Sequence, residues 1–214
     1  MSDESKQKNS ISMSVIRRLP RYYRFLTDAK EEGTLRISSQ ELARRMGLTA
    51  SQIRQDLNCF GGFGQQGYGY DVTRLLGEIG GLLGVNMAYP AIMIGGGNLG
   101  RAVAIYLAEQ PRGFDLQAIF EKDKALIGRP VSNINVMDVA TLEDYCRHNP
   151  TDAAILCIPS AAADKVVASL YDAGIRYFWN FSHYDIMMKY PDAIVENVHL
   201  GDSLMTLCYL VARN

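Results

Sequence analysis

The stretch Ala91-Ile92-Met93-Ile94-Gly95-Gly96-Gly97-Asn98-Leu99-Gly100-Arg101-Ala102-Val103-Ala104 decides the fold of this chain. A short apolar run ends in glycines, and a helical pattern follows at once. Gly95, Gly97 and Gly100 have the G-x-G-x-x-G spacing, which gives a tight strand-to-helix turn, close backbone approach to a pyrophosphate, and close helix–strand packing. The free N–H groups at the helix N-terminus would hold that pyrophosphate. We expect the binding turn to comprise Gly95, Gly96, Gly97, Asn98, Leu99 and Gly100.

An acidic residue follows this turn at the distance that a dinucleotide fold requires. A second strand pattern, residues 116–120, ends at Glu121, about 20 positions after Gly100. Such a carboxylate binds the adenosine ribose diol and repels a 2′-phosphate, so NAD(H) is favoured over NADP(H). Lys122 and Lys124 weaken that preference. The alternative is a phosphate-binding α/β turn for another nucleotide or CoA.

Length and charge suggest two parts with different partners. The chain has 214 residues, of which 48% are hydrophobic, enough for one large domain or two small ones. Residues 1–60 hold 11 Lys/Arg against 7 Asp/Glu, whereas the rest holds 11 against 16. This asymmetry indicates that only the N-terminal end approaches a polyanion. A solvated basic helix face is the alternative.

Cysteine and histidine positions argue against metal and disulfide chemistry. The four cysteines are scattered without a C-x-x-C pair, and the three histidines keep no metal-ligand spacing, so we expect no metal. Cys157 lies in an apolar strand pattern and Cys208 in an apolar helix, where buried thiols usually occur. Without a signal peptide or an 18-residue apolar span, the sequence predicts a cytoplasmic protein with no membrane partner.

The N-terminal part carries the start and stop signals of a helix-turn-helix. Residues 12–31 predict a helix that Pro20 kinks or splits. A capping-box pattern, Ser38 with the glutamate three residues later, opens the next helix, and Gly47 ends it. Thr49 opens a second helix, with Gln52 as its box partner. Two short helices with a glycine in the turn are typical of helix-turn-helix proteins.

The second of these helices is predicted to contact DNA. Its outward polar candidates are Ser51, Gln52, Arg54, Gln55 and Asn58. Residues 60–70 alternate aromatics with glycines and predict a two-stranded wing with Gln65-Gln66 at its tip. Arg17 and Arg18 on the first helix complete the predicted DNA-binding residues. A winged helix used only for protein contacts is the alternative.

The C-terminal part alternates strands and helices. We expect strands at residues 91–95, 115–120, 153–158 and 176–180, with helices at 98–109, 142–148 and 161–173. This pattern predicts a Rossmann-like parallel sheet with crossover helices. Pro159 falls just past a strand end, where such sheets bind ligands.

A helix over residues 73–84 is expected to bridge the two parts, with the boundary at 84–89. The terminal segment 201–214 is apolar nearly all round, so we expect a partner subunit to bury it. Fraying, or packing on its own sheet, is the alternative. The predicted organisation is a winged-helix domain at 1–85, a Rossmann NAD(H)-binding domain at 86–198, and a dimerisation helix at 199–214.

Nothing after the nucleotide fold could build a separate substrate domain. A dehydrogenase also needs an acid–base group beside the nicotinamide, and His183 is the one candidate near a strand end, without a partner carboxylate at a telling spacing. We therefore expect a DNA-binding protein whose ligand is a dinucleotide, not an enzyme. An NAD-dependent oxidoreductase with a helical N-terminal domain, or a CoA- or ADP-binding regulatory module, remains as an alternative.

Several motifs in order make a family resemblance specific. They are Arg17-Arg18-Leu19-Pro20-Arg21-Tyr22-Tyr23-Arg24, Ile53-Arg54-Gln55-Asp56-Leu57, Gly67-Tyr68-Gly69-Tyr70, the glycine turn, Ile127-Gly128-Arg129-Pro130-Val131, Asn180-Phe181 and Val195-Glu196-Asn197-Val198. The whole chain resembles the redox-sensing transcriptional repressors of the Rex family. The resemblance implies a homodimer with swapped C-terminal helices that senses NADH against NAD⁺ and releases operator DNA when NADH closes it. It also implies a place near the nicotinamide for Tyr106 and in an interdomain network for Arg24.

Five positions depart from the family pattern. Gln55 and the wing-tip pair Gln65-Gln66 stand where basic residues are common, which would weaken DNA binding and its salt dependence. Glu121 replaces an aspartate. His199 replaces an aspartate that pairs with the arginine matched by Arg24. The switch is therefore expected to use Asp202 or to be pH-sensitive.

Overall fold

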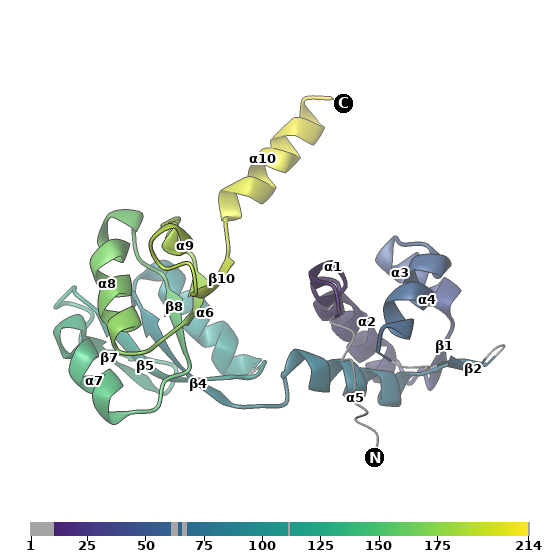
Figure 1. Ribbon diagram of the computed structural model, residues 1–214, viewed down its shortest axis with the longest axis horizontal. Helices are drawn as coiled ribbons and strands as arrows, with labels where there is room; N and C mark the ends of the chain where they lie inside the picture. The colour runs from purple at the N-terminus through teal and green to yellow at the C-terminus, as the bar shows by residue number, and fades with distance from the viewer. Residues whose placement is uncertain (1–10, 61–63, 66–67, 111, 214) are drawn as a thin grey trace, which may run out of the picture. The chain divides into compact units, whose positions relative to one another are not determined.

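We describe the protein from a computed structural model, which describes residues 11–60, 64–65, 68–110 and 112–213. The chain divides into two compact units, Met1–Asn86 and Met87–Asn214. Figure 1 draws the first unit in purple and blue and the second from teal through green to yellow.

The first unit is a set of short helices with a small antiparallel sheet. Its sheet has the order β1-β3-β2, with strands at Arg36–Ile37, Gly69–Asp71 and Gly64–Gln65 in that order. Its helices are α1 Met13–Ile16, α2 Leu19–Glu31, α3 Ser39–Met46, α4 Ala50–Asn58 and α5 Val72–Leu83. The helix-turn-helix α3–α4, followed by the β2–β3 hairpin, confirms the predicted winged helix.

Local signals explain where these helices begin and end. Pro20 lies in the first turn of α2, so the predicted helix over 12–31 is split into α1 and α2. Ser38 Oγ accepts the Glu41 N–H at 3.1 Å, and Thr49 Oγ1 accepts the Gln52 N–H at 3.1 Å. Gly47 ends α3 with φ +61°, a left-handed conformation that favours glycine.

The two expected capping boxes are each only half formed. The Glu41 carboxylate turns to the guanidinium groups of Arg44 and Arg45 instead of returning to the cap. The Gln52 amide donates to Asp56 at 2.8 Å. In both helices the side chain at the third position finds a charged partner on its own helix, which competes with the cap.

The core of the first unit joins all of its long helices. Fully buried side chains from α2, α3, α4 and α5 form one cluster; they include Tyr22, Leu26, Leu42, Met46, Ile53, Leu57, Leu75 and Ile79. The spacing Ile53–Leu57 gives α4 one apolar face. The opposite face of α4 stays free of the core.

The second unit is a seven-stranded sheet of order β10-β9-β8-β4-β5-β7-β6. The strands are β4 Tyr89–Ile94, β5 Phe114–Glu121, β6 Pro130–Val131, β7 Ile134–Asp138, β8 Ala153–Leu156, β9 Tyr177–Asn180 and β10 Ile194–Asn197. All pairs are parallel except β6 with β7. The helices are α6 Asn98–Glu109, α7 Leu142–His148, α8 Ser160–Asp172, α9 Ile186–Lys189 and α10 Leu200–Val211, with a 3-10 turn at Val139–Thr141.

Both faces of the central strands are buried, as a parallel sheet requires. Ile92 and Ile94 of β4 belong to a core with α7 and α8, whereas Met93 between them packs with α6 residues Ala104 and Leu107. The expected helices over 98–109 and 142–148 have the bounds of α6 and α7. The strands β1, β6, β7 and β10 and the helix α9 were not predicted from the sequence.

The terminal helix α10 is uncovered. Within the described part of the chain, no residue of α10 is buried, and Leu204 and Leu207 are 61% and 55% exposed. Cys208 is exposed as well, so the expectation of a buried thiol there is wrong for the single chain. Among the described residues, no helix is both long and apolar enough to cross a membrane.

Candidate functional site

The glycine turn joins the C-terminal end of β4 to α6. Gly95 has φ +100°, and a Cβ there would run into the backbone carbonyl of Cys157 on the neighbouring strand connection. The Gly95 N–H donates to the Phe120 carbonyl at 2.8 Å. Only glycine fits this turn, because both the dihedral angle and the neighbouring backbone exclude a side chain.

Gly100 and Gly97 have different surroundings. A Cβ on Gly100 would overlap the Gly95 carbonyl oxygen, so the first turn of α6 packs directly on the end of β4. Gly97 is the N-cap residue of α6, and a Cβ there would meet no described atom within 4 Å. The space beside Gly97 is therefore open, as close approach of a ligand to the backbone requires.

The N-terminus of α6 offers an anion site. The first N–H groups of a helix have no intrahelical partner, and the helix dipole favours negative charge there. Asn98 and Leu99 begin α6 and are both exposed. This arrangement fits a phosphate group next to Gly97.

Glu121 lies against the glycine turn. Its carboxylate accepts the Gly96 N–H at 2.9 Å, and also the N–H groups of Lys122 at 2.7 Å and Asp123 at 3.0 Å. The side chain is half-buried at the end of β5. The structure thus places a carboxylate next to the expected phosphate site, where ribose hydroxyls could donate to it.

A second crossover helix begins at the same edge of the sheet. Pro159 is the N-cap residue of α8 and follows β8. The Cys157 N–H donates to the Ile94 carbonyl at 2.8 Å, which ties this connection to the end of β4. Pro159 therefore lies at the same edge of the sheet as the glycine turn.

Tyr106 lies elsewhere. It is eight residues after Asn98, roughly 12 Å further along α6. It is 44% exposed and lines a mostly apolar cavity of about 440 Å³ between α6 and strands β8–β10, with Trp179 and Phe114. Arg112 and Glu196 bring charges to its wall and were missed by the sequence analysis. The place of Tyr106 near a nicotinamide stays a prediction.

The exposed face of α4 carries three of the predicted DNA-binding residues. Ser51, Arg54 and Gln55 are exposed, and Arg54 reaches Ser39 on α3, with Nη1 3.3 Å from its Oγ. Gln52 is half-buried, and its amide donates to Asp56 at 2.8 Å. The wing residue Gln65 lies in β2, and Gln66 lies outside the described residues.

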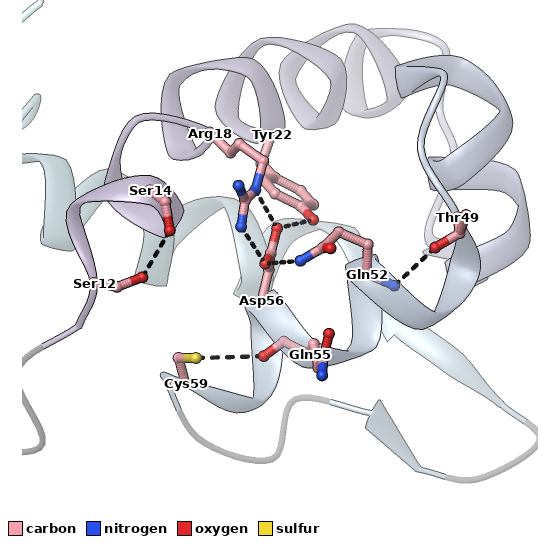
Figure 2. A network of polar contacts seen from close by, with 9 residues as sticks. All are labelled: Ser12, Ser14, Arg18, Tyr22, Thr49, Gln52, Gln55, Asp56 and Cys59. Carbon is pink, nitrogen blue, oxygen red and sulfur yellow. Dashed lines mark hydrogen bonds and ion pairs between the residues drawn. The ribbon is translucent and has the colours of Figure 1, made fainter.

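The basic residues of α1 and α2 also differ in their roles. Arg17 is exposed at the end of α1, whereas Arg18 forms a salt bridge with Asp56 at 2.7 Å. Figure 2 shows Arg18, Tyr22 and Gln52 converging on the Asp56 carboxylate. The sequence analysis gave Asp56 no role; the available signal was its place three residues after Ile53 and next to Leu57, on the apolar face of α4.

The predicted switch residues lie in both units. Arg24 is exposed on α2, with its guanidinium 5.4 Å from the ring centre of Phe25. His199 is the N-cap residue of α10, and its Nδ1 lies 2.8 Å from Nδ1 of His183. Asp202 is exposed in the first turn of α10. The sequence analysis missed the pairing of the two histidines, which the fold brings together from the segments after β9 and β10.

A metal centre finds no support in the geometry. Among the residues that the structure describes, no group of three or more His, Cys, Asp or Glu side chains could hold a metal ion.

Two family models match the chain, one on each unit. A model described as the putative DNA-binding protein N-terminus matches residues 10–58, and one described as the CoA binding domain matches residues 86–184. The first match covers the helix-turn-helix. The second covers the glycine turn and Glu121.

Two relatives that match nearly the whole chain carry the same name. The redox-sensing transcriptional repressor Rex of Thermoanaerobacter pseudethanolicus is 50% identical over 203 residues, covering 95% of this chain and 90% of that protein. Rex of Clostridium perfringens is 45% identical over 209 residues, covering 98% of each chain.

Solved structures agree with these relatives. The crystal structure of RSP in complex with NAD⁺ and operator DNA is 49% identical, with a TM-score of 0.87, over 95% of this chain and 93% of that one. RSP in complex with NADH is 45% identical, with a TM-score of 0.86, over 96% of each chain. The chain therefore belongs to the Rex family of redox-sensing transcriptional repressors.

Proposed function

We propose that this protein represses transcription by binding operator DNA and releases the DNA when the ratio of NADH to NAD⁺ rises. One observation carries the proposal: a single chain holds both a winged helix and a glycine turn with a carboxylate bound against it. The first is a DNA-binding element, and the second selects an unphosphorylated adenosine ribose.

The dinucleotide site is built by the edge of the sheet around β4. Gly95, Gly96, Gly97, Asn98, Leu99 and Gly100 form the turn that would hold the pyrophosphate, with Pro159 beside them. Glu121 would accept hydrogen bonds from the ribose hydroxyls and repel the 2′-phosphate of NADP(H). The same repulsion disfavours CoA, which carries a 3′-phosphate.

Discrimination between the oxidised and reduced forms depends on the nicotinamide end. The ring is cationic in NAD⁺ and neutral in NADH, so an apolar wall would exclude the oxidised form through its desolvation cost. Tyr106, together with the region of Leu200 from a second copy, would supply that wall. NADH binding releases DNA only if NADH has a higher affinity for the state of the protein that cannot bind DNA. Moving that balance from 1:99 to 99:1 requires about 5.5 kcal/mol of differential affinity, which two sites in a dimer would share.

The DNA contacts are assigned to the exposed face of α4 and to the basic end of α1. Ser51, Arg54 and Gln55 would reach base edges or phosphates, with Arg17 on the flanking backbone. The glutamine at position 55 and those at 65 and 66 make no charged phosphate contact, so the salt dependence of binding should be shallow.

We infer a homodimer in which α10 of each chain packs on the other. The support is the exposed apolar surface of α10, which a helix in water does not leave uncovered. Arg24 on the winged helix and His199 or Asp202 at the start of α10 are the proposed switch contacts. A cytoplasmic location is part of the proposal, because operator DNA is the proposed partner.

The test is fluorescence anisotropy of a labelled palindromic upstream DNA fragment, titrated with the protein at fixed salt. We expect release by NADH and retention with NAD⁺. Equal affinity of NADH for free and DNA-bound protein would refute the switch. An NAD-dependent oxidoreductase is the alternative function, and steady turnover of NADH with a small carbonyl substrate would establish it instead.

A further inference from the structure

A buried carboxylate sits between the recognition helix α4 and the helix α2. Asp56 is 1% exposed. Arg18 donates to it twice, from Nε and Nη2, each at 2.7 Å. Tyr22 donates from its hydroxyl at 3.0 Å and Gln52 from Nε2 at 2.8 Å. Figure 2 shows these three side chains around the Asp56 carboxylate.

The position of Asp56 on α4 is one where a core residue is expected. Ile53, Asp56 and Leu57 follow the i, i+3, i+4 spacing, and the two apolar members are fully buried. Burial by itself would raise the pKa of the Asp56 carboxyl, but hydrogen bonds from its three partners outweigh burial and hold the pKa below its usual 3.8. Asp56 therefore stays ionised at neutral pH inside the unit.

The network removes two basic or polar side chains from the DNA-facing surface. The guanidinium group of Arg18 is bound to Asp56, and 29% of the Arg18 side chain is exposed. Gln52 turns its amide inward, away from the exposed Gln55 on the same helix. Both were predicted DNA contacts, and both donate hydrogen bonds to one carboxylate.

The geometry also fixes α4 about its own axis. Arg18 is the N-cap residue of α2 and Tyr22 lies in its first turns, so a rotation or shift of α4 on α2 would break their three bonds to Asp56 together. The direction in which Ser51, Arg54 and Gln55 point is set by that rotation.

We propose that Asp56 is a positioning residue for operator recognition: it holds α4 in the orientation that reads the DNA and neutralises Arg18, which would otherwise bind any DNA. The inference rests on the proposed function. Affinity for operator and affinity for random DNA depend on different properties of the protein. Binding to operator needs the orientation of α4, whereas binding to random DNA depends on net positive charge.

The experiment compares the full-length protein with the Asp56→Asn variant on operator and on a scrambled duplex of equal length. Asparagine keeps the shape of the side chain and removes its charge. We expect the operator Kd to rise on the order of tenfold, comparable to loss of one good base contact. The Kd for scrambled DNA should stay equal or fall, because Arg18 is no longer neutralised.

The matched control is Asp28→Asn, which makes the same charge change at an exposed position of α2. This variant should strengthen binding to both duplexes by the same factor and leave the ratio of operator to scrambled affinity unchanged. Tyr22→Phe is the second variant, because it removes one bond to Asp56 and keeps the ring in the core. We expect it to reduce the ratio of operator to scrambled affinity by about twofold to fivefold.

The outcomes are distinguishable. If Asp56 acts only on folding, Asp56→Asn weakens binding to operator and to scrambled DNA by the same factor. That factor equals the loss of folded protein measured by circular dichroism. This result would overturn the proposal. An unchanged ratio in Tyr22→Phe overturns it as well, even where Asp56→Asn fails to fold. Failure of the unmodified protein to bind operator would instead contradict the proposed function.

Discussion

Two glycines of one turn, Gly97 and Gly100, should separate dinucleotide binding from folding when each is replaced by alanine. Gly97 has φ −69° and ψ −165°, which alanine adopts without strain, and its Cβ would meet no described atom within 4 Å. The free energy of unfolding of Gly97→Ala should therefore change by no more than about 0.5 kcal/mol. The methyl group would still occupy the space that a pyrophosphate must approach.

The expected loss of binding follows from the hydrogen bonds at stake. A bond from a backbone N–H to a charged group contributes about 1.5–3 kcal/mol. Pushing the phosphate away from one such N–H should raise the NADH Kd of Gly97→Ala roughly 10- to 150-fold.

Gly100→Ala should behave in the opposite way. Its Cβ would overlap the Gly95 carbonyl oxygen, which is backbone and cannot rotate aside, so α6 must move off β4. Overpacking of this kind costs about 1–3 kcal/mol. In a chain of this size the melting temperature should fall by about 2–12 °C.

The assay is thermal unfolding by circular dichroism together with calorimetric titration of NADH, both on the full-length variants. Gly81→Ala on α5 is the control, because its Cβ also meets no described atom within 4 Å and it lies in the other unit. A Gly97→Ala protein that binds NADH as tightly as the unmodified chain would refute the assignment of the pyrophosphate site. A Gly100→Ala protein of unchanged stability would refute the packing argument.

Four further predictions follow from single residues. Glu121→Gln should raise the NADH Kd about 10-fold or more and narrow the preference over NADPH, measured by calorimetry with both ligands. Leu207→Glu on α10 should raise the dimer Kd at least about 10-fold, because burial of one leucine contributes about 1.5–3 kcal/mol; sedimentation velocity would detect monomers. The folded-state pKa of Asp56 lies below 3.8, so its contribution to stability is complete above that pH and is lost as the pH falls further. The free energy of unfolding in urea should therefore fall more with decreasing pH in the acid range for the unmodified protein than for Asp56→Asn. Burial raises the pKa of the Cys157 thiol to about 12, so iodoacetamide at neutral pH should spare Cys157 and modify Cys208 only where the dimer is dissociated.

The sequence predicted best where one backbone requirement allows few residues. The turn at Gly95, the bounds of α6 and the caps at Ser38 and Thr49 follow from local chemistry, and the structure has each of them. The strand β6 has two residues, too few for a periodic pattern, and it pairs with the adjacent β7. The strands β7 and β10 are placed by parallel pairing with β5 and β9, which a local pattern does not indicate.

Side-chain directions were harder to predict than elements. Gln52 was assigned to the DNA surface because a polar side chain near a helix start is usually solvated. Its actual partner, Asp56, is four residues later on the same helix, a spacing at which glutamine and aspartate bond. The pairing of His183 with His199 had no local signal, because it depends on the parallel arrangement of β9 and β10.

The uncovered helix α10 has a consequence for genetics. Given the proposed pairing through α10, a chain that keeps α10 but carries a damaged α4 would still form pairs with normal chains. Each mixed pair would present one working half to a palindrome. Because affinity for a two-fold operator needs both halves, such an allele would be dominant over the normal gene, whereas an allele that loses α10 would be recessive. Expressing the two kinds of variant beside the normal chain in one cell would reveal this difference in derepression.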